Sequence, residues 1–508
     1  MTSGTNTSYS LSLRRSLASG MVLNILVNLL LYLGHLIIAR HLPRDDYAVF
    51  TVVVSFVSLM ALFADLGLTL LFVRKFAEAE TRAAEGKQDT RGELLGSMLA
   101  LRFGMAIVVS LVVIIITPAL GYDISIRHLM MIMLITLFIS SRLLVVRSVG
   151  EAFLRGHNRY HLVALFASID AIVFAAVLFY YSGNILNLEG AIWIYSLCHI
   201  PGFILLFGLI YREGKSIGFH LKFSFRTVTS MLREGFPLIL STAFLTIHGQ
   251  ADPLLLDKLS TPKEVSAFGA GLRILSAIIF LPAVFSAVIG PLVTQATVSQ
   301  DFDKIRSTVE RSLRLLLLGA LFIAVTLTVS STSVLSILFG SDKYSDAAPL
   351  AIIFGWTFIP ICFASFVIDI AIAEGRFWIS SLFSSIIMII SLGCDLILIP
   401  HYGALGAGAA KCIALTTGNI LLIYLSPRLF VITRNKILRM YSDLFFVGLI
   451  SLAIYYLLSY LMLPSSAILC VVIITFFLSA TILIKVVAFS EITSFVYGLF
   501  SKLKTDKS

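Results

Sequence analysis

The chain has 508 residues, of which 58% are hydrophobic and 13% are charged, and its formal net charge is +10. A soluble domain carries roughly a quarter of charged residues, so the composition excludes an ordinary soluble protein. The excess of Lys and Arg does not indicate nucleic-acid binding, because membrane proteins gather positive charge in their cytoplasmic loops. No metal or cofactor is expected, because no pair of cysteines has metal-ligand spacing. The cysteines are Cys198, Cys362, Cys394, Cys412 and Cys470.

Continuous apolar segments predict about fourteen transmembrane helices. A helix needs about 20 mostly apolar residues to cross the hydrocarbon core, and only helices or closed barrels satisfy their backbone hydrogen bonds there. These segments are runs of Leu, Ile, Val and Phe, unlike the alternating strands of a barrel. The predicted fold class is therefore an all-α polytopic membrane protein. The predicted spans are residues 18–38, 47–73, 94–118, 128–150, 162–182, 189–211, 235–256, 265–291, 313–338, 347–372, 378–399, 404–426, 443–463 and 466–488.

Positive charges predict the orientation of these spans. Arg14 and Arg15 precede the first span, and no small-residue cleavage site follows it, which indicates a retained helix rather than a signal peptide. With both termini in the cytoplasm, 26 Lys and Arg residues fall in cytoplasmic segments and six on the opposite side. The positive-inside rule predicts this asymmetry. The loops between the spans are too short to hold a soluble catalytic domain.

A weak internal repeat predicts two lobes of six helices. Gly156 and Gly375 each precede an apolar helix, and Gly190 and Gly406 each follow the next short external turn. Six-plus-six repeats are a known transporter architecture, with the site between the halves. We therefore expect an N-terminal lobe, a cytoplasmic linker, a C-terminal lobe, and two extra helices with a cytoplasmic tail, at residues 1–215, 216–234, 235–430 and 431–508.

Four ionisable residues lie inside predicted spans of the first half: Asp65, Arg102, Arg142 and Asp170. Such residues are costly in a membrane unless they are paired or hydrated, so they are candidates for a functional site. Equal depth on consecutive spans predicts an Asp65–Arg102 ion pair and an Arg142–Asp170 ion pair. Each pair either lines a cavity or only joins two helices, and the sequence leaves both interpretations open.

The second half offers a similar set of buried charges. Asp252 precedes Pro253, which removes a helical hydrogen-bond donor and opens the backbone locally. Arg273 lies in the outer part of the next span, and Asp395 and Lys411 flank a short turn at similar depth. These residues are further candidates for either a cavity lining or a structural pair.

No motif indicates an enzyme. The segment Gly214-Lys215-Ser216 resembles the end of a phosphate-binding loop, but five residues separate Gly208 from Gly214 where four are required. The GxSxG, HExxH and DFG-type motifs are missing as well.

Several segments together resemble a known family. Residues 399–407 are similar to its IP-x-YG-x-x-GA turn, and residues 338–348 to its LFG-x-x-Y-x-x-A segment. Residues 250–273 resemble its Q-x-D-x-x-x-L stretch and the arginine that follows, with Phe268 in place of the usual tyrosine. On this basis the chain resembles the polysaccharide flippases, of O-antigen and exopolysaccharide type, in the multidrug/oligosaccharidyl-lipid/polysaccharide exporter superfamily.

The resemblance implies a fold of two six-helix lobes around a cavity, plus two peripheral helices, in a bacterial inner membrane. It implies that the chain moves undecaprenyl-diphosphate-linked oligosaccharide units to the outer leaflet by alternating access, for polysaccharide biosynthesis. The expected partners are this lipid-linked glycan, membrane lipids, a coupling proton or sodium ion, and polysaccharide polymerase machinery. The expected substrate-binding and cavity residues are Arg102, Arg142, Asp65, Asp170, Asp252, Arg273 and Lys411.

Three alternatives differ in the substrate or in the chemistry. A peptidoglycan lipid-precursor flippase shares the architecture. A multidrug or cation exporter of the same superfamily should line its cavity with acids and aromatics, and the arginines argue against it. A membrane glycan polymerase or ligase needs catalytic groups in a sizeable outer loop, which this sequence lacks.

Overall fold

The computed structural model describes most of the chain, and nearly all of the described part is α-helical. The segment with Arg14 and Arg15, most of the second half of predicted span 265–291, and the C-terminal tail lie outside the described residues. The described residues are 23–65, 67–86, 89–143, 145–157, 159–183, 186–217, 221–279, 281–282, 285, 293, 303–373, 376–425, 428–429, 432–461 and 465–484.

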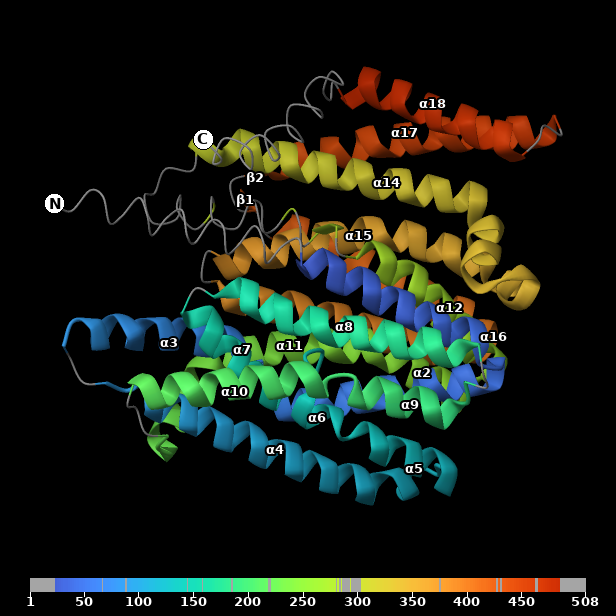
Figure 1. Cartoon of the computed structure of the whole chain (residues 1–508). Helices are drawn as coiled ribbons and strands as arrows, with labels where there is room; N and C mark the ends of the chain where they lie inside the picture. Colours follow the sequence, from blue (N-terminus) through green and yellow to red (C-terminus); the bar gives the residue numbers. More distant parts are fainter. Residues whose placement is uncertain are drawn as a thin grey trace, which may run out of the picture. The chain divides into compact units, whose positions relative to one another are not determined.

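The predicted all-α membrane fold is confirmed (Figure 1). Within the described ranges, nine helices are long and apolar enough to cross a membrane. The first of these helices is Leu23–His41. The further helices of the first half are α2 (Arg44–Asp65), α3 (Thr69–Ala84), α4 (Arg91–Ala119), α5 (Ile124–Met133), α6 (Thr136–Ile139), α7 (Val146–Gly156), α8 (Tyr160–Ser182), α9 (Leu188–Leu197) and α10 (Ile200–Ile217).

The second half continues the helical pattern. The elements are α11 (Phe225–Leu259), α12 (Pro262–Ile278), α14 (Asp303–Phe339), the 3-10 helix η1 (Ser341–Ala347), α15 (Ala348–Ala373), α16 (Phe377–Leu425), α17 (Arg434–Tyr460) and α18 (Ser465–Ile484). Between α16 and α17, the short strands β1 (Arg428–Leu429) and β2 (Ile432–Thr433) pair antiparallel.

Predicted span 47–73 is two helices rather than one. α2 ends at Asp65 and α3 begins at Thr69, and Gly67 between them has a φ of +58°. A Cβ atom at Gly67 would stand 2.7 Å from the hydroxyl oxygen of Thr242, so this position accepts only glycine without rearrangement. The break therefore places Asp65 at a helix end.

Predicted span 128–150 is interrupted twice. It consists of α5, the single turn α6 and the first residues of α7, and Ser140 after α6 has extended backbone with a ψ of 135°. Arg142 consequently lies in an irregular segment between α6 and α7. The depth predicted for Arg142 assumed one continuous helix, so it does not hold after this interruption.

Predicted spans 378–399 and 404–426 are the two arms of α16. The arms meet at Gly403, whose φ of +53° and ψ of −130° are not helical. The Glu264 carboxylate on α12 accepts the backbone N–H of Ala404 over 2.8 Å. An acidic side chain from a neighbouring helix therefore satisfies a donor that the break exposes.

η1 holds the connection between the first helix and α2. Arg44 of α2 forms an ion pair with Asp346 of η1, with 2.9 Å between Nη2 and Oδ2. The Lys343 ammonium donates to the backbone oxygens of Ala39, Arg40 and Leu42, over 2.9, 3.0 and 2.5 Å. We call these contacts the η1 clasp. A lysine in this position satisfies carbonyl groups at the end of the first helix.

The chain forms two compact units. The first comprises residues 1–280, 336–350 and 376–414, and the second comprises residues 281–335, 351–375 and 415–508. The units interleave along the sequence, and the predicted division into lobes at the linker stays a prediction.

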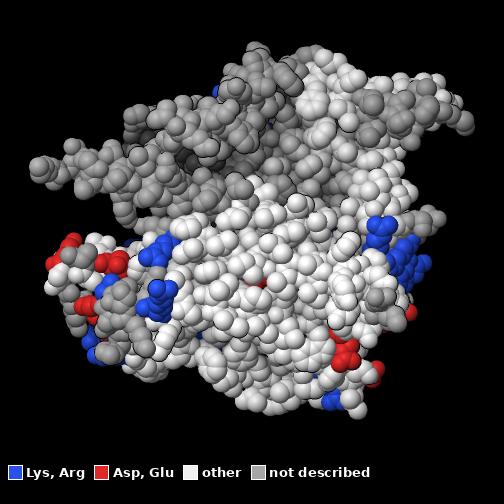
Figure 2. All heavy atoms as spheres, viewed as in Figure 1, with Lys and Arg blue, Asp and Glu red and all other residues white. Residues whose placement is uncertain are grey.

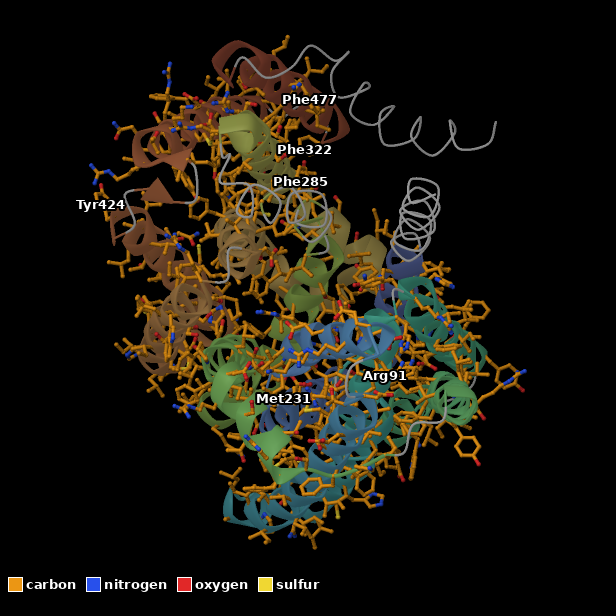
Figure 3. All side chains as sticks on the ribbon, turned by 90° about the vertical axis from the view of Figure 1, so that its left-hand side faces the viewer. Arg91, Met231, Phe285, Phe322, Tyr424 and Phe477 are labelled. Atoms are coloured by element: carbon orange, nitrogen blue, oxygen red, sulfur yellow. The ribbon has the colours of Figure 1, made fainter. Side chains whose placement is uncertain are left out.

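In the first unit, α2 lies against α11 and α12 (Figure 1). An apolar core joins α3, α4, α7 and α11, where Phe72, Met98, Phe153 and Met231 are buried. Met231 of this core is labelled in Figure 3. In the second unit, the rings of Phe322 on α14 and Phe477 on α18 point toward each other, with 5.5 Å between their centroids (Figure 3).

Candidate substrate site

Arg102 on α4 donates hydrogen bonds to a carboxylate, a hydroxyl and a backbone oxygen. Its Nη1 donates to the Asp65 carboxylate and, over 3.3 Å, to the backbone oxygen of Val145. Its Nη2 donates to the Thr69 hydroxyl over 3.0 Å, and the residue is only 1% exposed. The predicted Asp65–Arg102 pair is therefore confirmed. The pair closes the break between α2 and α3 and ties it to α4.

Asp170 on α8 pairs with Arg147 on α7, so the predicted Arg142–Asp170 pair is wrong. The Arg147 Nη1 and Asp170 Oδ2 atoms are 2.5 Å apart, and both side chains are buried. The Arg147 Nε atom also donates to Glu151 over 3.2 Å. Sequence analysis missed Arg147 and Glu151. Their spacing of four residues on one helix was the available signal.

This buried pair joins two helix breaks. Arg147 Nη1 donates to the backbone oxygens of Ile139, at the end of α6, and His199, between α9 and α10, over 3.4 and 3.3 Å. Asp170 Oδ1 accepts the N–H of Gly202 in the first turn of α10 over 2.8 Å. One ion pair thus satisfies backbone groups that two interrupted helices leave free.

Arg142 has aromatic and imidazole neighbours in place of a carboxylate. Its Nη1 donates to His35 Nε2 over 3.2 Å, and its guanidinium lies 4.7 Å from the ring centres of Phe174 and Tyr195. No carboxylate of the described residues forms an ion pair with it, and its Nε and Nη2 atoms are buried without a hydrogen-bond partner.

Arg273 on α12 joins the same group through Tyr47 on α2, since its Nε donates to the Tyr47 hydroxyl over 3.3 Å. The Tyr47 ring packs on Phe50, which in turn contacts the rings of His35 and Tyr195. Within the described part of the chain Arg273 likewise has no ion pair. We call this group the arginine–aromatic cluster, and its members are His35, Tyr47, Phe50, Arg142, Phe174, Tyr195 and Arg273. It brings together two predicted site residues that are 131 positions apart in sequence, and both keep their positive charge uncompensated.

A third group of charges links α11 and α16. Lys411 Nζ lies 2.7 Å from Asp252 Oδ2 and donates to the backbone oxygen of His248 over 2.9 Å. The Asp395 carboxylate on α16 is a neighbour of both Asp252 and Lys411. Asp252 and Asp395 are 0% exposed and Lys411 is 4% exposed. The structure thus brings together Asp252 and Lys411 of the predicted site, and no ion pair among the described residues links them to the arginine–aromatic cluster.

Other ion pairs lie outside the spans, where water screens them. Arg91 pairs with Asp89 and Glu80, over 2.8 and 3.2 Å, and the hydrogen bond from Arg91 lowers the pKa of Asp89. Charged side chains gather at the two ends of the helices on the face in Figure 2, and the band between is almost uncharged. Exposed pairs of this kind contribute about 1 kcal/mol or less. The described residues contain no group of three His, Cys, Asp or Glu side chains that could hold a metal.

The long apolar helices, their breaks and the buried charges define a polytopic membrane protein of transporter type. A family model described as "Polysaccharide biosynthesis protein" matches residues 13–297, which is more than half of the chain. The chain therefore belongs to this family, and the resemblance to the exporter superfamily is confirmed. The MatE model also matches, over residues 237–399. No curated protein sequence matches the chain significantly.

Solved structures of the same superfamily share the fold. One is "Lipid II flippase MurJ, inward closed conformation", with a TM-score of 0.70, 15% identity, and coverage of 91% of this chain and 98% of that chain. Another is an inward-facing multidrug resistance MATE family transporter, with a TM-score of 0.64, 15% identity, and coverage of 80% and 94%. A mutant of the Vibrio cholerae MATE transporter VcmN gives 0.57, 13%, 82% and 97%. At these identities the likeness defines the fold, and the substrate must be argued from the site.

Proposed function

We propose that the chain flips undecaprenyl-diphosphate-linked oligosaccharide units from the inner to the outer leaflet of a bacterial inner membrane, with both termini in the cytoplasm. Membership of the polysaccharide biosynthesis family supports the pathway. The single observation that supports the substrate class is the pair of uncompensated guanidinium groups, Arg142 and Arg273, in the arginine–aromatic cluster.

Arg142 and Arg273 differ from Arg102 and Arg147 because no carboxylate among the described residues pairs with them. Arg102 and Arg147 each face a carboxylate, so their charge is already neutralised. A guanidinium inside a membrane protein is costly without an anion or water. A site with two such groups is therefore suited to a ligand that brings negative charge. The diphosphate of a lipid-linked glycan carries that charge next to its sugars.

The aromatic rings beside Arg142 and its unused nitrogen donors suit such a ligand. Phe174 and Tyr195 lie close to the guanidinium, and contacts of this kind attract a cation to the face of a ring. Its Nε and Nη2 donors remain without a protein acceptor among the described residues. Guanidinium donors bind phosphate oxygens in a fork-like, bidentate manner.

The same charges discriminate between the alternatives. Two uncompensated arginines repel a cationic drug, so a multidrug or cation exporter fits this cluster poorly. A peptidoglycan lipid-precursor flippase remains the second candidate, since the fold is shared with the lipid II flippase MurJ. Both substrates present a lipid diphosphate, and they differ in the attached glycan.

The proposal is tested by polysaccharide export in a strain that depends on this chain. Arg142→Ala and Arg273→Ala should each abolish export while protein abundance stays normal. Arg→Lys at either site should restore part of the export, because lysine keeps the charge but loses the fork. Arg74→Ala, on the exposed part of α3, is the matched control and should export normally. Normal export by both cluster variants would overturn the proposal. Restoration of peptidoglycan synthesis in a strain lacking its precursor flippase would favour the second candidate.

A further inference from the structure

The buried group on α11 and α16 contains more negative than positive charge. Asp252 and Asp395 supply two carboxylates, and Lys411 supplies one ammonium. The neighbouring titratable groups include His248, one turn before Asp252, which offers its backbone oxygen to Lys411, and the Cys394 thiol beside Asp395. With both carboxylates ionised and the imidazole neutral, the group carries one negative charge. A buried unpaired charge is strongly unfavourable, so one additional cation is needed.

The hydrogen bonds of Asp395 indicate which cation this is. Asp395 is fully buried, and its polar neighbours are the Asp252 carboxylate and the Ser391 hydroxyl. With both carboxylates ionised, neither oxygen of Asp395 meets a well-placed donor among the described residues. A proton on one carboxyl group turns an acceptor into a donor. The O–H can then be donated to the neighbouring carboxylate, so a single proton removes the excess charge and supplies the missing hydrogen bond.

A metal cation fits the group less well. Hard cations require several oxygen ligands around one point. The Lys411 ammonium already lies 2.7 Å from Asp252, and it repels a second cation at this short distance.

We propose that Asp252, Asp395 and Lys411 form a proton-binding site in which the Lys411 ammonium acts as a built-in counter-ion and excludes sodium. In the protonated state, one carboxyl group carries an O–H bond and the group is neutral. On release, that O–H bond breaks, the proton passes to water, and both carboxylates face Lys411. This inference goes beyond the proposed function, because it identifies the ion and does not depend on the lipid that is carried.

The exclusion of sodium is tested with the purified full-length chain in detergent. Thermal unfolding is measured in sodium chloride and in choline chloride at equal ionic strength. The wild-type chain should unfold at the same temperature in both salts. Lys411→Ala should gain a sodium-dependent increase of several degrees, because sodium that binds only the folded state stabilises it. Lys258→Ala removes an exposed lysine beside Asp257 and should show no such gain.

Two results would overturn the exclusion of sodium. One is a sodium-dependent increase in the wild-type chain that Asp395→Asn removes. The other is a folded Lys411→Ala variant without any gain in sodium. The wild-type measurement needs no variant, so it decides the question even where Lys411→Ala does not fold.

The bound proton is tested by counting protons. The purified wild-type chain and Asp395→Asn are moved from alkaline to acidic pH, and proton uptake is measured with a pH indicator. The wild-type chain should take up an additional proton per molecule relative to Asp395→Asn, which resembles the protonated residue in shape and charge. Equal uptake by two folded proteins would overturn the proton site and leave the arginine–aromatic cluster unaffected.

Discussion

Arg147 and Asp170 form a buried ion pair that satisfies the backbone at two helix breaks at once. The guanidinium reaches the end of α6 and the segment between α9 and α10, and the carboxylate holds the first turn of α10. Both side chains are buried within the protein, so their contacts with these backbone groups are a condition for the fold of this region.

We therefore expect Arg147→Ala to lower stability and abundance. Removing one partner of a buried pair costs about 3–5 kcal/mol, because the other charge is left unpaired. The unfolding temperature in detergent should fall clearly, and the double variant Arg147→Met, Asp170→Leu should recover part of the loss. A stable Arg147→Ala protein that cannot export would contradict this structural role.

Arg102 should behave in the same way, and differently from Arg142. Its Nη1 and Nη2 atoms donate to Asp65, Thr69 and Val145. Arg102→Ala should lower abundance, and the double variant Arg102→Ala, Asp65→Ala should restore both abundance and export in a cell-based assay. Failure of the double variant to export, with abundance restored, would assign Arg102 to substrate handling.

The break in α16 should depend on Gly403. Alanine there is strained by about 1–3 kcal/mol, and its Cβ would stand 2.6 Å from the Glu264 carboxylate. Gly403→Ala should lower the unfolding temperature. Gly393→Ala is the matched control, since nothing lies within 4 Å of a Cβ at that glycine. Equal unfolding temperatures for the two variants would refute the requirement for glycine.

The orientation of the chain can be mapped with reporter fusions. Fusions after Lys87 and Ser224 should report the cytoplasm, and a fusion near Asp342 should report the opposite side. The asymmetry of Lys and Arg along the chain motivates this expectation. A reporter at Ser224 that reads outside would rule out both the orientation and the assignment of the linker.

The helical segments could be predicted from the sequence, because a long apolar segment in lipid satisfies its own backbone hydrogen bonds only as a helix. The turn predicted between spans 378–399 and 404–426 coincides with the break at Gly403. The breaks at Gly67 and Ser140 were not predicted, since apolar residues continue on both sides of each. A break is stabilised by a distant side chain, such as Glu264 beside Ala404, and that contact is invisible in the local pattern.

The missed breaks explain the error in the predicted site. Asp65 and Arg102 lie on helices that run regularly up to the pair, so matched depth predicted their contact correctly. Arg142 follows the interruption at Ser140, and the irregular backbone brings Arg147 to Asp170 instead. The convergence of Arg142 and Arg273 on one group of aromatic rings required the packing of distant segments, which one sequence does not specify.

The η1 clasp has a consequence for the speed of any opening at that end of the protein. The Lys343 ammonium is shared among three backbone oxygens. Water can replace those oxygens only after η1 and the end of the first helix have separated by about the width of one water molecule. The hydrogen bonds of Lys343 are therefore lost before new hydrogen bonds to water form, and this loss gives the opening step an activation barrier with a large enthalpy. A transport cycle that includes this step would slow steeply on cooling, and Lys343→Ala would flatten that temperature dependence.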